Sequence, residues 1–340
     1  MSKRKFKVAI AGATGAVGEA MLEVLAQRRF PVGELIPLAS ERSAGGEVDF
    51  GRQKLKVRRL DEFDFSGVDI ALFSAGGSVS AEHAPRAAAA GTWVVDNSSE
   101  FRYRKHIPLV VTEVNPEAIE QARKHRIIAN PNCSTMQMLV ALAPIHRAVG
   151  IRRINVATYQ SVSGAGRSAM EELGRQTADL LAFKSPRAER FPMQIAFNAI
   201  PHIDVFQDNG YTREEMKMVW ETQKILDRRI KVNATAVRVP VFYGHAEAVH
   251  LETREAISVD EVRRLLSTAP GVQLVDEHKP AGYPTPVTHA AGKDPVFVGR
   301  LRQDLSHPRG LSMWIVADNI RKGAALNAVQ IAELLVEHYL

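Results

Sequence analysis

IANPNCST, residues 128–135, contains the only cysteine in the 340-residue chain, and an apolar run from 136 to 145 follows it. This pattern predicts a strand, a tight Asn-Pro-Asn turn and a helix whose first turn begins near Cys133, capped by Asn132 or Ser134. The N–H groups and the positive dipole end of such a helix favour a thiolate, the form of cysteine that attacks carbonyl groups. A buried structural cysteine is the alternative, because free cysteines are often simply buried.

The composition limits the classes of protein to consider. The chain is 45% hydrophobic and 24% charged, as expected of a soluble globular protein, and it is long enough for two domains. A single cysteine cannot form an intramolecular disulfide, so we expect a reducing compartment, the cytoplasm. The basic N-terminus lacks the apolar core of a signal peptide, and no apolar run is long enough to cross a bilayer. The net charge of +6 is dispersed among acidic residues. We therefore expect small anionic ligands as partners and neither nucleic acid nor a membrane.

A glycine-rich turn follows the first predicted strand. Residues 7–11 read as a buried strand, residues 12–18 read GATGAVG, and a helical pattern begins directly after them. Strand, glycine turn and helix in this order are the context of a dinucleotide-binding fingerprint. The glycines let the backbone approach a pyrophosphate, and the helix N-terminus supplies N–H donors. The spacing is G-x-x-G-x-x-G rather than G-x-G-x-x-G, and an ordinary tight turn is the alternative.

The ends of the next predicted strands also suit a nucleotide. SERSAGG, residues 40–46, follows the strand 35–39, and Arg42 with its two serines favours the 2′-phosphate of NADP, although Glu41 must then point away. Gly76 lies in the glycine-rich end of the strand 68–73, and Arg102 follows the strand 93–96, where anionic ligands bind a parallel sheet. Each arginine alone is also explained as a surface charge. Alternating strands and helices from 6 to 133 predict a doubly wound α/β domain.

After residue 150 the pattern changes to strand-like segments, which predict an α+β second domain. A strand over 154–161 runs into QSVSGAGR, residues 160–167, and a helix to about residue 183 and a long irregular segment follow. A helix that begins with a Thr212 capping box carries Glu221 and Lys224, whose spacing is typical of a weak surface salt bridge. Arg238 and His245 lie on or after a strand over 234–242, and an ion pair or a surface histidine explains each alone. Further elements are expected at 246–253, 259–266 and 296–301, with a C-terminal helix from 318 to 340 that returns to the first domain.

A nucleotide-binding fold combined with one reactive thiol predicts aldehyde chemistry through a thioester. The thiolate adds to the aldehyde, a hydride passes to a nicotinamide, and a second nucleophile takes the acyl group. His245 is the natural candidate for the acid or base that this chemistry needs. No cluster of potential ligands has the spacing of a metal site, so we expect no metal.

On these residues the sequence resembles the aspartate-β-semialdehyde dehydrogenase family, in its bacterial branch, over essentially its whole length. The matching motifs are GATGAVG at 12–18, NPNCST at 130–135, QSVSGAG at 160–166, ETQK at 221–224, DN at 318–319 and KGAA at 322–325. Together they are highly specific, although the nucleotide loop alone is not. The resemblance implies an N-terminal Rossmann-like, doubly wound NADP-binding domain formed by residues 1–132 and 319–340. It also implies an α+β catalytic and dimerisation domain over residues 133–318.

The resemblance assigns roles to the residues that match the family's motifs. It implies that Cys133 is the nucleophile, His245 the acid or base, and Gln160 the group that orients the acyl intermediate. For the substrate, the implied contacts are Arg238 to the α-carboxylate, Glu221 to the α-amino group, Arg102 and Lys224 to phosphate, and Asn132. For the NADP 2′-phosphate they are Ser40, Arg42 and Ser43. The remaining implied cofactor contacts are Gly12, Thr14, Gly15, Ala16, Val17, Gly76, Ser163, Gly164 and Asn319.

The implied reaction is the reversible reduction of L-aspartyl-4-phosphate by NADPH to L-aspartate-4-semialdehyde and phosphate. It leads towards lysine through diaminopimelate, and towards threonine, methionine and isoleucine, and the family is typically homodimeric. One alternative is an N-acetyl-γ-glutamyl-phosphate reductase, a family that normally has Pro-Gly-Cys where this chain has Pro131-Asn132-Cys133. The other is a catalytically inactive relative, which would lack the cysteine.

Overall fold

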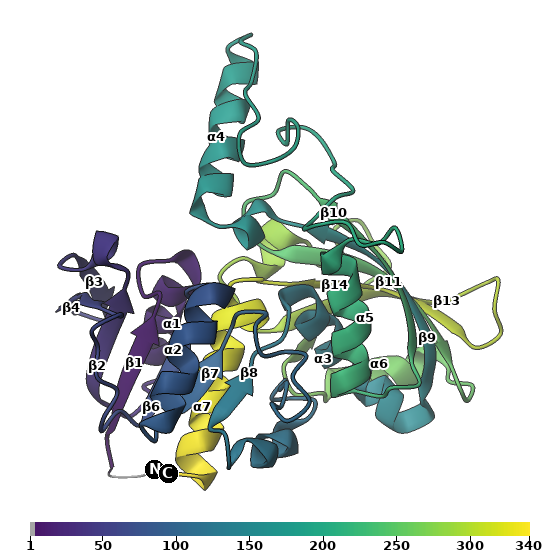
Figure 1. The fold of residues 1–340 in the computed structure, drawn as a ribbon. Coiled ribbons are helices and arrows are strands. Elements are labelled where there is room, and N and C mark those ends of the chain that lie inside the picture. Colours follow the sequence, from purple (N-terminus) through teal and green to yellow (C-terminus); the bar gives the residue numbers. More distant parts are fainter. Residues whose placement is uncertain (1–3) are drawn as a thin grey trace. The chain divides into compact units, whose positions relative to one another are not determined.

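The computed structural model describes residues 4–340, so Met1 to Lys3 of the basic N-terminal run lie outside the described residues. The chain divides into two compact units. The first contains the described residues up to Pro131 together with Ala324–Leu340, and the second contains Asn132–Gly323. Residues 319–323, which the sequence-based division places with the first domain, therefore cluster with the second unit. Figure 1 labels most of the helices and strands of both units.

The first unit is built on a parallel sheet of six strands in the order β5-β2-β1-β6-β7-β8. The strands are β1 (Phe6–Ala11), β2 (Val32–Ala39), β5 (Arg58–Arg59), β6 (Ile70–Phe73), β7 (Trp93–Asp96) and β8 (Ile127–Ala129). The central strands are almost entirely buried, which explains why they read as continuous apolar runs. The chain winds outward from β1 in both directions, so the strand order reverses between β1 and β6. Ligands of such sheets bind at this reversal, outside the carboxyl ends of the strands.

Helices cover this sheet, and the last one returns from the C-terminus as predicted. They are α1 (Ala16–Gln27), α2 (Gly77–Ala89) and α7 (Leu326–His338), with short 3₁₀ turns η1 (Glu41–Ser43) and η2 (Pro116–Ala122) and a hairpin of β3 (Glu47–Phe50) and β4 (Gln53–Lys56). Helix α2 packs on β6, β7 and β8, whereas α7 packs on α1 and β7. The buried Asn327 amide fastens α7 by donating to the Val110 carbonyl at 2.9 Å and to Asn130 Oδ1 at 2.6 Å. The predicted Rossmann-like unit is thus confirmed.

The second unit is a mixed six-stranded sheet with helices packed on it, which confirms the predicted α+β class of this domain. Its strand order is β10-β9-β11-β14-β13-β12, in which β10 and β9 are parallel, β12 and β13 are parallel, and the other pairs are antiparallel. The strands are β9 (Ile151–Gln160), β10 (Lys231–Arg238), β11 (His245–Thr253), β12 (Val272–Leu274), β13 (Val296–Gln303) and β14 (Gly310–Ala317). Helices α3 (Cys133–Val149), α5 (Arg213–Ile225) and α6 (Val259–Ser267) pack on the sheet and on each other. Burial alternates along β9, so its second face is partly exposed.

Several boundaries differ from those that the sequence predicts. Strand β14 was not predicted at all, although it is almost fully buried in the middle of the sheet. The strand predicted to reach Phe242 ends at Arg238, because Pro240 cannot donate to a sheet ladder. The C-terminal helix begins at Leu326 rather than near Asp318, after a π-helical turn η5 (Arg321–Ala325) and a loop that clusters with the second unit.

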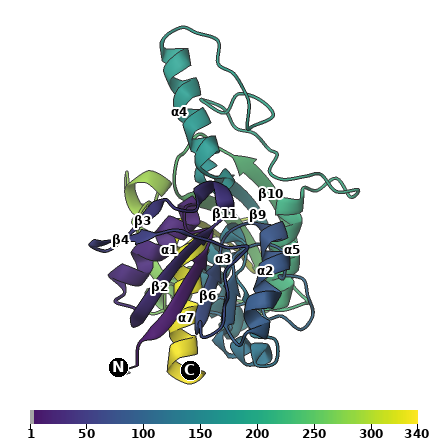
Figure 2. The ribbon, with the colours of Figure 1, turned by 60° about the vertical axis from the view of Figure 1, so that its left-hand side comes forward.

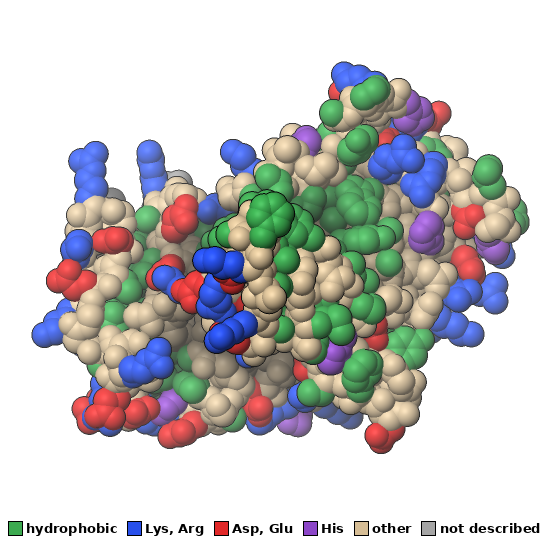
Figure 3. All heavy atoms as spheres, turned by 90° about the horizontal axis from the view of Figure 1, so that it is seen from above, with side chains coloured by type: hydrophobic (Ala, Val, Ile, Leu, Met, Phe, Trp, Pro, Cys, Tyr) green, Lys and Arg blue, Asp and Glu red, His purple; other side chains and the backbone are tan. Residues whose placement is uncertain are grey.

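Helix α4 (Arg167–Leu181) extends away from the sheet of the second unit, and a long irregular segment returns from it (Figures 1 and 2). Its base is fastened by a small apolar cluster that includes Val162, Leu173 and Ile195. Hydrophobic side chains gather where Figure 3 looks down on this helix. The exposed apolar residues of α4 and the following segment are Leu181, Phe183, Met193, Phe197, Val205 and Phe206. No helix within residues 4–340 is long and apolar enough to span a membrane.

Candidate active site

Cys133 is the first residue of α3, and the predicted turn-to-helix junction is confirmed. Of the two capping candidates, Asn132 is the cap: its Oδ1 accepts from the N–H groups of Ser134 at 3.1 Å and Thr135 at 3.2 Å. The cysteine is partly exposed, unlike most of the helix that follows it. The alternative of a fully buried structural cysteine therefore fails, and the thiol lies beside the positive end of a 17-residue helix.

The strand ends of the second unit bring three more predicted residues to one end of the sheet. Gln160 ends β9 and is the direct partner of Arg238, which ends the parallel strand β10. His245 begins the antiparallel strand β11 opposite Ala317, the last residue of β14. Because β11 runs in the opposite direction to β9, its first residue lies at the end where β9 stops. Gln160 thus lies beside residues that are 78 and 85 positions away in the sequence.

His245 is fully buried and has a defined proton arrangement. Its Nδ1 accepts from the backbone N–H of Ser161 at 3.1 Å, so the proton of the neutral ring lies on Nε2. That Nε2 has no hydrogen-bond partner among residues 4–340. Burial, and then the charge of Arg238, lower the pKa of His245 to about 3. The ring is therefore neutral at ordinary pH, and its unpartnered N–H can donate to a group that enters the site.

Arg238 and two glycines define the immediate surroundings of these groups. The Arg238 guanidinium donates to the Ser161 carbonyl at 2.7 Å, and burial lowers its pKa, an effect that the charges of Glu214 and Cys133 oppose. A Cβ at Gly164 would lie 3.1 Å from Arg238 Nη1 and 3.3 Å from His245 Nε2. A Cβ at Gly323 would lie only 2.7 Å from the Cβ of Cys133. The backbone at 323 therefore approaches the nucleophile as closely as only glycine permits.

Helix α5 supplies buried acidic groups on the other side of Asn132. The Asn132 backbone N–H donates to Glu221 Oε2 at 2.6 Å, and Glu221 has no exposed surface. The interpretation of Glu221 and Lys224 as a surface salt bridge, which their spacing suggests, is therefore wrong. Lys224, one turn further along the helix, is partly buried; burial lowers its pKa and Glu221 partly offsets the effect. Glu221 thus belongs to the interior of the second unit and contacts the cap of the cysteine helix.

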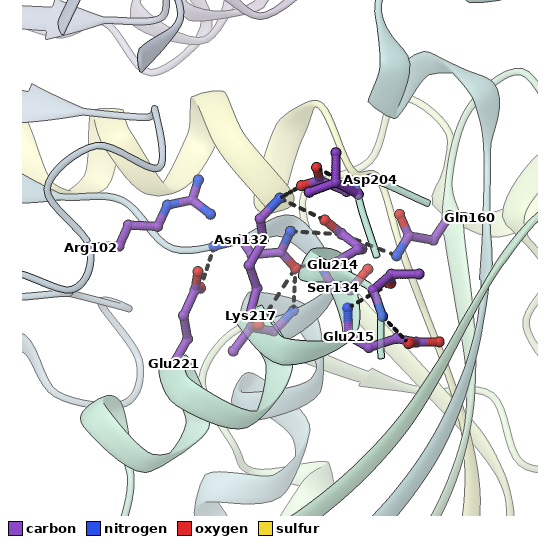
Figure 4. A network of polar contacts seen from close by, with 12 residues as sticks. Arg102, Asn132, Ser134, Gln160, Asp204, Glu214, Glu215, Lys217 and Glu221 are labelled. Atoms are coloured by element: carbon purple, nitrogen blue, oxygen red, sulfur yellow. Dashed lines mark hydrogen bonds and ion pairs between the residues drawn. The ribbon is translucent and has the colours of Figure 1, made fainter. Parts of the chain in front are cut away.

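Two residues that sequence reasoning missed complete this network, which Figure 4 shows. The Glu214 carboxylate accepts from Asn132 Nδ2 at 2.8 Å, Gln160 Nε2 at 3.3 Å and Lys217 Nζ at 3.0 Å. Burial alone would raise the pKa of Glu214, but the charge of Lys217 and these hydrogen bonds lower it to about 2. A signal was available in the sequence, because positions 214, 218, 221 and 225 form one helical stripe and all four are buried.

Asn319 and Ser163 contact each other, and Asn319 is linked to His245 through the Ser161 hydroxyl. Asn319 Oδ1 accepts from the Ser161 hydroxyl at 3.0 Å and from the Gly244 N–H at 3.0 Å, while its Nδ2 donates to Ser163 Oγ at 2.9 Å. Both side chains are buried. These bonds hold the turn η3 (Val162–Ala165), which carries Gly164, against the residues that follow β14.

The predicted nucleotide loop of the first unit has the expected geometry. Gly12 follows β1 with φ of +86°, and a Cβ there would lie 2.5 Å from the carbonyl oxygen of Ser74, which follows β6. The loop therefore lies at the reversal of the strand order and leaves no room for a side chain. Helix α1 starts at Ala16, and its cap Gly15 offers no side-chain acceptor to the first N–H groups. Thr14, Gly15, Ala16 and Val17 are all accessible.

The remaining predicted contacts of the first unit lie at the carboxyl ends of its other strands. Ser40, Arg42 and Ser43 are in and before the turn η1 that follows β2, and Arg42 is exposed. Glu41 lies within 3.3 Å of the Arg59 guanidinium, so the contrary acidic residue has a cationic partner of its own. Gly76 is the exposed cap of α2 after β6. Arg102, after β7, is buried and donates to the Asn97 carbonyl at 2.9 Å.

The two units match two descriptions of one class of enzyme. Residues 7–122 match "Semialdehyde dehydrogenase, NAD binding domain", and residues 142–322 match "Semialdehyde dehydrogenase, dimerisation domain". The fold and the thiol site therefore define a semialdehyde dehydrogenase. Groups of three or more potential metal ligands are absent from residues 4–340.

Comparisons with individual proteins narrow the class. The chain is 62% identical over 338 residues to "Aspartate-semialdehyde dehydrogenase" of Legionella pneumophila, covering 99% of this chain and 97% of that one. Its structure is similar, with a TM-score of 0.97 and 60% identity over 99% of this chain and 100% of the other, to aspartate semialdehyde dehydrogenase II from Vibrio cholerae complexed with ASA. A more distant structure is that of the Candida albicans aspartate semialdehyde dehydrogenase with NADP, with a TM-score of 0.76 and 26% identity over 98% of this chain and 99% of that chain.

The chain belongs to the aspartate-semialdehyde dehydrogenase family. It is therefore an oxidoreductase of amino-acid biosynthesis with a nicotinamide-dinucleotide-binding domain. The recognition, the fold class and the enzyme class that the sequence predicts are confirmed, and the comparisons do not favour the N-acetyl-γ-glutamyl-phosphate reductase. The roles of individual residues stay predictions.

Proposed function

We propose that this enzyme reduces L-aspartyl-4-phosphate to L-aspartate-4-semialdehyde and phosphate, through a thioester on Cys133. The single observation that carries the proposal is the partly exposed thiol at the start of α3 with the unpartnered Nε2–H of His245 and the Arg238 guanidinium in the same unit. The thiolate attacks the acyl phosphate carbonyl, and phosphate leaves with the bonding electrons of the C–O bond. His245 Nε2–H donates a hydrogen bond to the carbonyl oxygen of the acyl group. This oxygen becomes negatively charged when a hydride is added to the thioester.

The nucleotide loop fits a dinucleotide, because Gly12 lets the chain turn tightly against the Ser74 carbonyl and no side chain caps the N–H groups at the start of α1. Gly12, Thr14, Gly15, Ala16, Val17 and Gly76 would hold it in the first unit, and Ser163, Gly164 and Asn319 are the contacts that the second unit would contribute. When bound, NADPH supplies the hydride of the reaction. NADP is proposed over NAD because Arg42 is exposed while Glu41 has Arg59 as a partner.

The charged groups of the second unit suit an amino-acid substrate. A guanidinium binds a carboxylate with two parallel hydrogen bonds, so Arg238 is proposed to bind the α-carboxylate. Glu221 is proposed to bind the α-ammonium and Lys224 the phosphate, with Asn132 as a further contact. Arg102, which belongs to the first unit, is also proposed as a phosphate contact. Gln160 is proposed to orient the acyl group. An N-acetylated substrate would place a neutral amide at the position where Glu221 is proposed to bind a cation. A site discriminates strongly against a substrate that leaves the polar groups of the site unpaired.

The deciding experiment is an NADPH oxidation assay with L-aspartyl-4-phosphate and N-acetyl-γ-glutamyl phosphate side by side. We expect kcat/KM to be higher for the aspartyl substrate by at least about 10⁴-fold. This is the discrimination typical of a polar site against a substrate that lacks the polar group which the site binds. Comparable values for the two substrates, or a preference for the acetylated one, would contradict the substrate assignment. The same assay with NADH in place of NADPH tests the cofactor.

The assembly and location belong to the same proposal. A homodimer through the second unit is supported by the family description of residues 142–322 and by the exposed apolar residues of α4 and the segment after it. Sedimentation at micromolar concentration should show a particle of twice the chain mass. A cytoplasmic location is proposed from the single free cysteine.

A further inference from the structure

A surface pocket of the first unit has no role in the proposed function. Its volume is about 410 Å³, which is in the range of pockets that bind small molecules. It lies between the last turns of α2 and the edge strand β8, and residues from three segments line it, 85–89, 101–107 and 124–127. Helix α2 packs on β8, as Figure 1 shows. We call this cavity the α2–β8 pocket.

The α2–β8 pocket combines buried apolar side chains with exposed basic ones. Phe101, Ile107 and Ile127 are buried and line it. Four further lining residues are exposed and basic: Arg104, His106, Lys124 and His125. None of the lining residues within the described range 4–340 is acidic. An anion that carries an apolar body fits such a surface, because burial of the body and attraction of the charge then act together.

The basic side chains lie close enough together to act on one ligand. The rings of His106 and His125 come from different segments, and their centres are 5.5 Å apart. Arg104 pairs with Glu100, which offsets its charge. Lys124 and the two imidazoles have no carboxylate partner among residues 4–340, so the ammonium and the ring N–H groups are available to a ligand.

The turn that carries Lys124 and His125 is held in a conformation that is uncommon for its residue types. Arg126, the next residue, has φ of +51°, in the left-handed region that residues with a side chain rarely adopt. Its side chain fastens the turn by donating to the Gly91 carbonyl at 2.6 Å and by lying over the Trp93 ring. Strain of this kind persists only where the surrounding structure holds it, and it is found most often at binding sites.

The α2–β8 pocket is separate from the predicted nucleotide loop. Gly76 caps the start of α2, whereas residues 85–89 form its last turns, on the order of 15 Å further along the axis at about 1.5 Å per residue. Nucleotides bind outside the carboxyl ends of parallel strands, but Ile127 is the first residue of β8, at its amino end. Arg102, the proposed phosphate contact of this unit, is buried and is not among the lining residues.

We propose that the α2–β8 pocket binds a small organic phosphate with an apolar body. A phosphate monoester carries nearly two negative charges at pH 7 and three strong acceptor oxygens, whereas a carboxylate carries one charge and two oxygens. Lys124 and His125 on one segment and His106 on another supply donors for a phosphate group, and Phe101 and Ile127 supply the apolar surface for the body. All of these residues belong to the first unit, so the site stands whether or not the proposed reaction does.

Titration calorimetry of the whole enzyme with phenyl phosphate tests the site. We expect a dissociation constant below about 1 mM, and we expect Lys124→Glu to weaken binding by at least about tenfold, because it replaces a cation of the pocket with an anion. Lys105→Glu is the matched control, because Lys105 is an exposed lysine of the segment 101–107 that does not line the pocket. It should alter the dissociation constant by less than about threefold. Equal binding by wild type and Lys124→Glu, or no binding by wild type up to about 10 mM, would overturn the proposal.

Two further probes separate the parts of the ligand. Inorganic phosphate lacks the apolar body and benzoate lacks the second charge, so each should bind the pocket at least about tenfold more weakly than phenyl phosphate. Equal affinity for inorganic phosphate would show a general anion surface, and equal affinity for benzoate would remove the preference for a phosphate, so either result would contradict the assigned ligand class. Equal weakening by Lys124→Glu and Lys105→Glu would show an effect of net charge alone and would also overturn the site.

The proposed active site also binds phosphate, so a last control distinguishes the two sites and rests on the proposed function. The KM for phosphate in oxidation of the semialdehyde should be the same in Lys124→Glu and wild type. A KM that rises in parallel with the dissociation constant would assign phenyl phosphate to the active site and overturn the pocket. A wild-type enzyme that fails the NADPH assay while its binding of phenyl phosphate still depends on Lys124 would remove the proposed reaction and keep the pocket. Normal turnover with binding that is independent of Lys124 would do the reverse.

Discussion

The candidate sites of the two units are formed by different kinds of groups, backbone in the first unit and side chains in the second. In the first unit the nucleotide loop is made of backbone: Gly12 lies against the Ser74 carbonyl, and no side chain caps the N–H groups at the start of α1. In the second unit the thiol site is made of buried polar side chains, with Glu214 and Glu221 around Asn132 and with His245 behind Ser161. The glycine turn and the helix start of the first unit are specified by residues close together in the sequence, although the carbonyl that Gly12 meets follows another strand. A site made of side chains depends on strand ends that only the complete sheet brings together.

The largest expected effect comes from removal of the nucleophile, which tests whether the thiol site and the nucleotide loop are separate sites. Cys133→Ala should lower turnover by at least about 10³-fold, because Cys133 is the only thiol in the chain and alanine cannot form the acyl intermediate. The dissociation constant for NADP, measured by fluorescence titration, should change less than about twofold, because most of the proposed cofactor contacts lie in the first unit. Substantial steady-state activity in this variant would refute the covalent mechanism. A large loss of NADP affinity would refute the separation of the two sites.

Two glycine substitutions sharpen the comparison. Gly12→Ala places a Cβ 2.5 Å from the Ser74 carbonyl at a φ of +86°, and should weaken NADP binding by on the order of 10²-fold while leaving Cys133 alkylation intact. Gly323→Ala places a Cβ 2.7 Å from the Cys133 Cβ, and should change the alkylation rate while leaving NADP binding intact. Titration and alkylation of each variant make the check. If each substitution impaired both measurements equally, the sites could not be regarded as independently built.

The same contrast explains what the sequence could predict. The glycine loop, the Asn132 cap and the Thr212 capping box were all predicted and are confirmed, because each is determined by residues a few positions apart. The parallel order of the first sheet follows from alternating strands and helices, with connections too long for hairpins.

The rest needed tertiary structure. Glu214 with Lys217 and Glu221 with Lys224 have the same spacing on α5, so local pattern makes both pairs look like surface salt bridges. Only the packing of α5 on α3 and β10 buries them. Strand β14 was missed because periodicity alone does not distinguish a short, almost fully buried apolar strand from a buried helical segment. The partnership of Gln160 with Arg238 depends on sheet register, which no single segment reveals.

Substitution of Arg42 tests a proposed side-chain contact to the 2′-phosphate of NADP in the first unit, where the rest of the nucleotide loop is made of backbone. Arg42→Ala should weaken NADP binding by roughly 1.5–3 kcal/mol, the value of a hydrogen bond to a charged group, while NAD binding stays nearly constant. Competition titrations with the two cofactors measure both affinities. Glu47→Ala, a change at an exposed residue of the nearby strand β3, is a suitable control. Equal weakening of NADP and NAD would place Arg42 outside the 2′-phosphate contact.

The smallest expected effect concerns Glu247, a buried carboxyl on β11 two residues after His245. Neither of its oxygens has a hydrogen-bond partner of good geometry among residues 4–340, and the same is true of Gln137 Oε1 nearby on α3. Burial raises the pKa of Glu247 well above its ordinary value, and the Gln137 side chain offsets only part of that effect. The comparison between units thus has an internal exception, because this polar side chain belongs to the core of the second unit without a partner network.

The pH dependence of stability follows from the direction of that shift. Well below the ordinary glutamate pKa of 4.5, Glu247 is protonated in both the folded and the unfolded chain. Above it the unfolded chain releases the proton while the folded chain retains it, so the free energy of unfolding declines as the pH rises, until the folded group also ionises. Glu247→Gln removes this decline, because an amide does not titrate and its NH₂ can donate to Gln137 Oε1. We expect the variant to be more stable than wild type by at least about 1 kcal/mol at pH 8. The difference should be smaller at pH 5. Urea unfolding at the two pH values measures it, with the exposed Glu255→Gln as the control. A stability difference that is the same at pH 5 and pH 8, or a less stable variant at pH 8, would show that Glu247 is already ionised and satisfied in the folded enzyme.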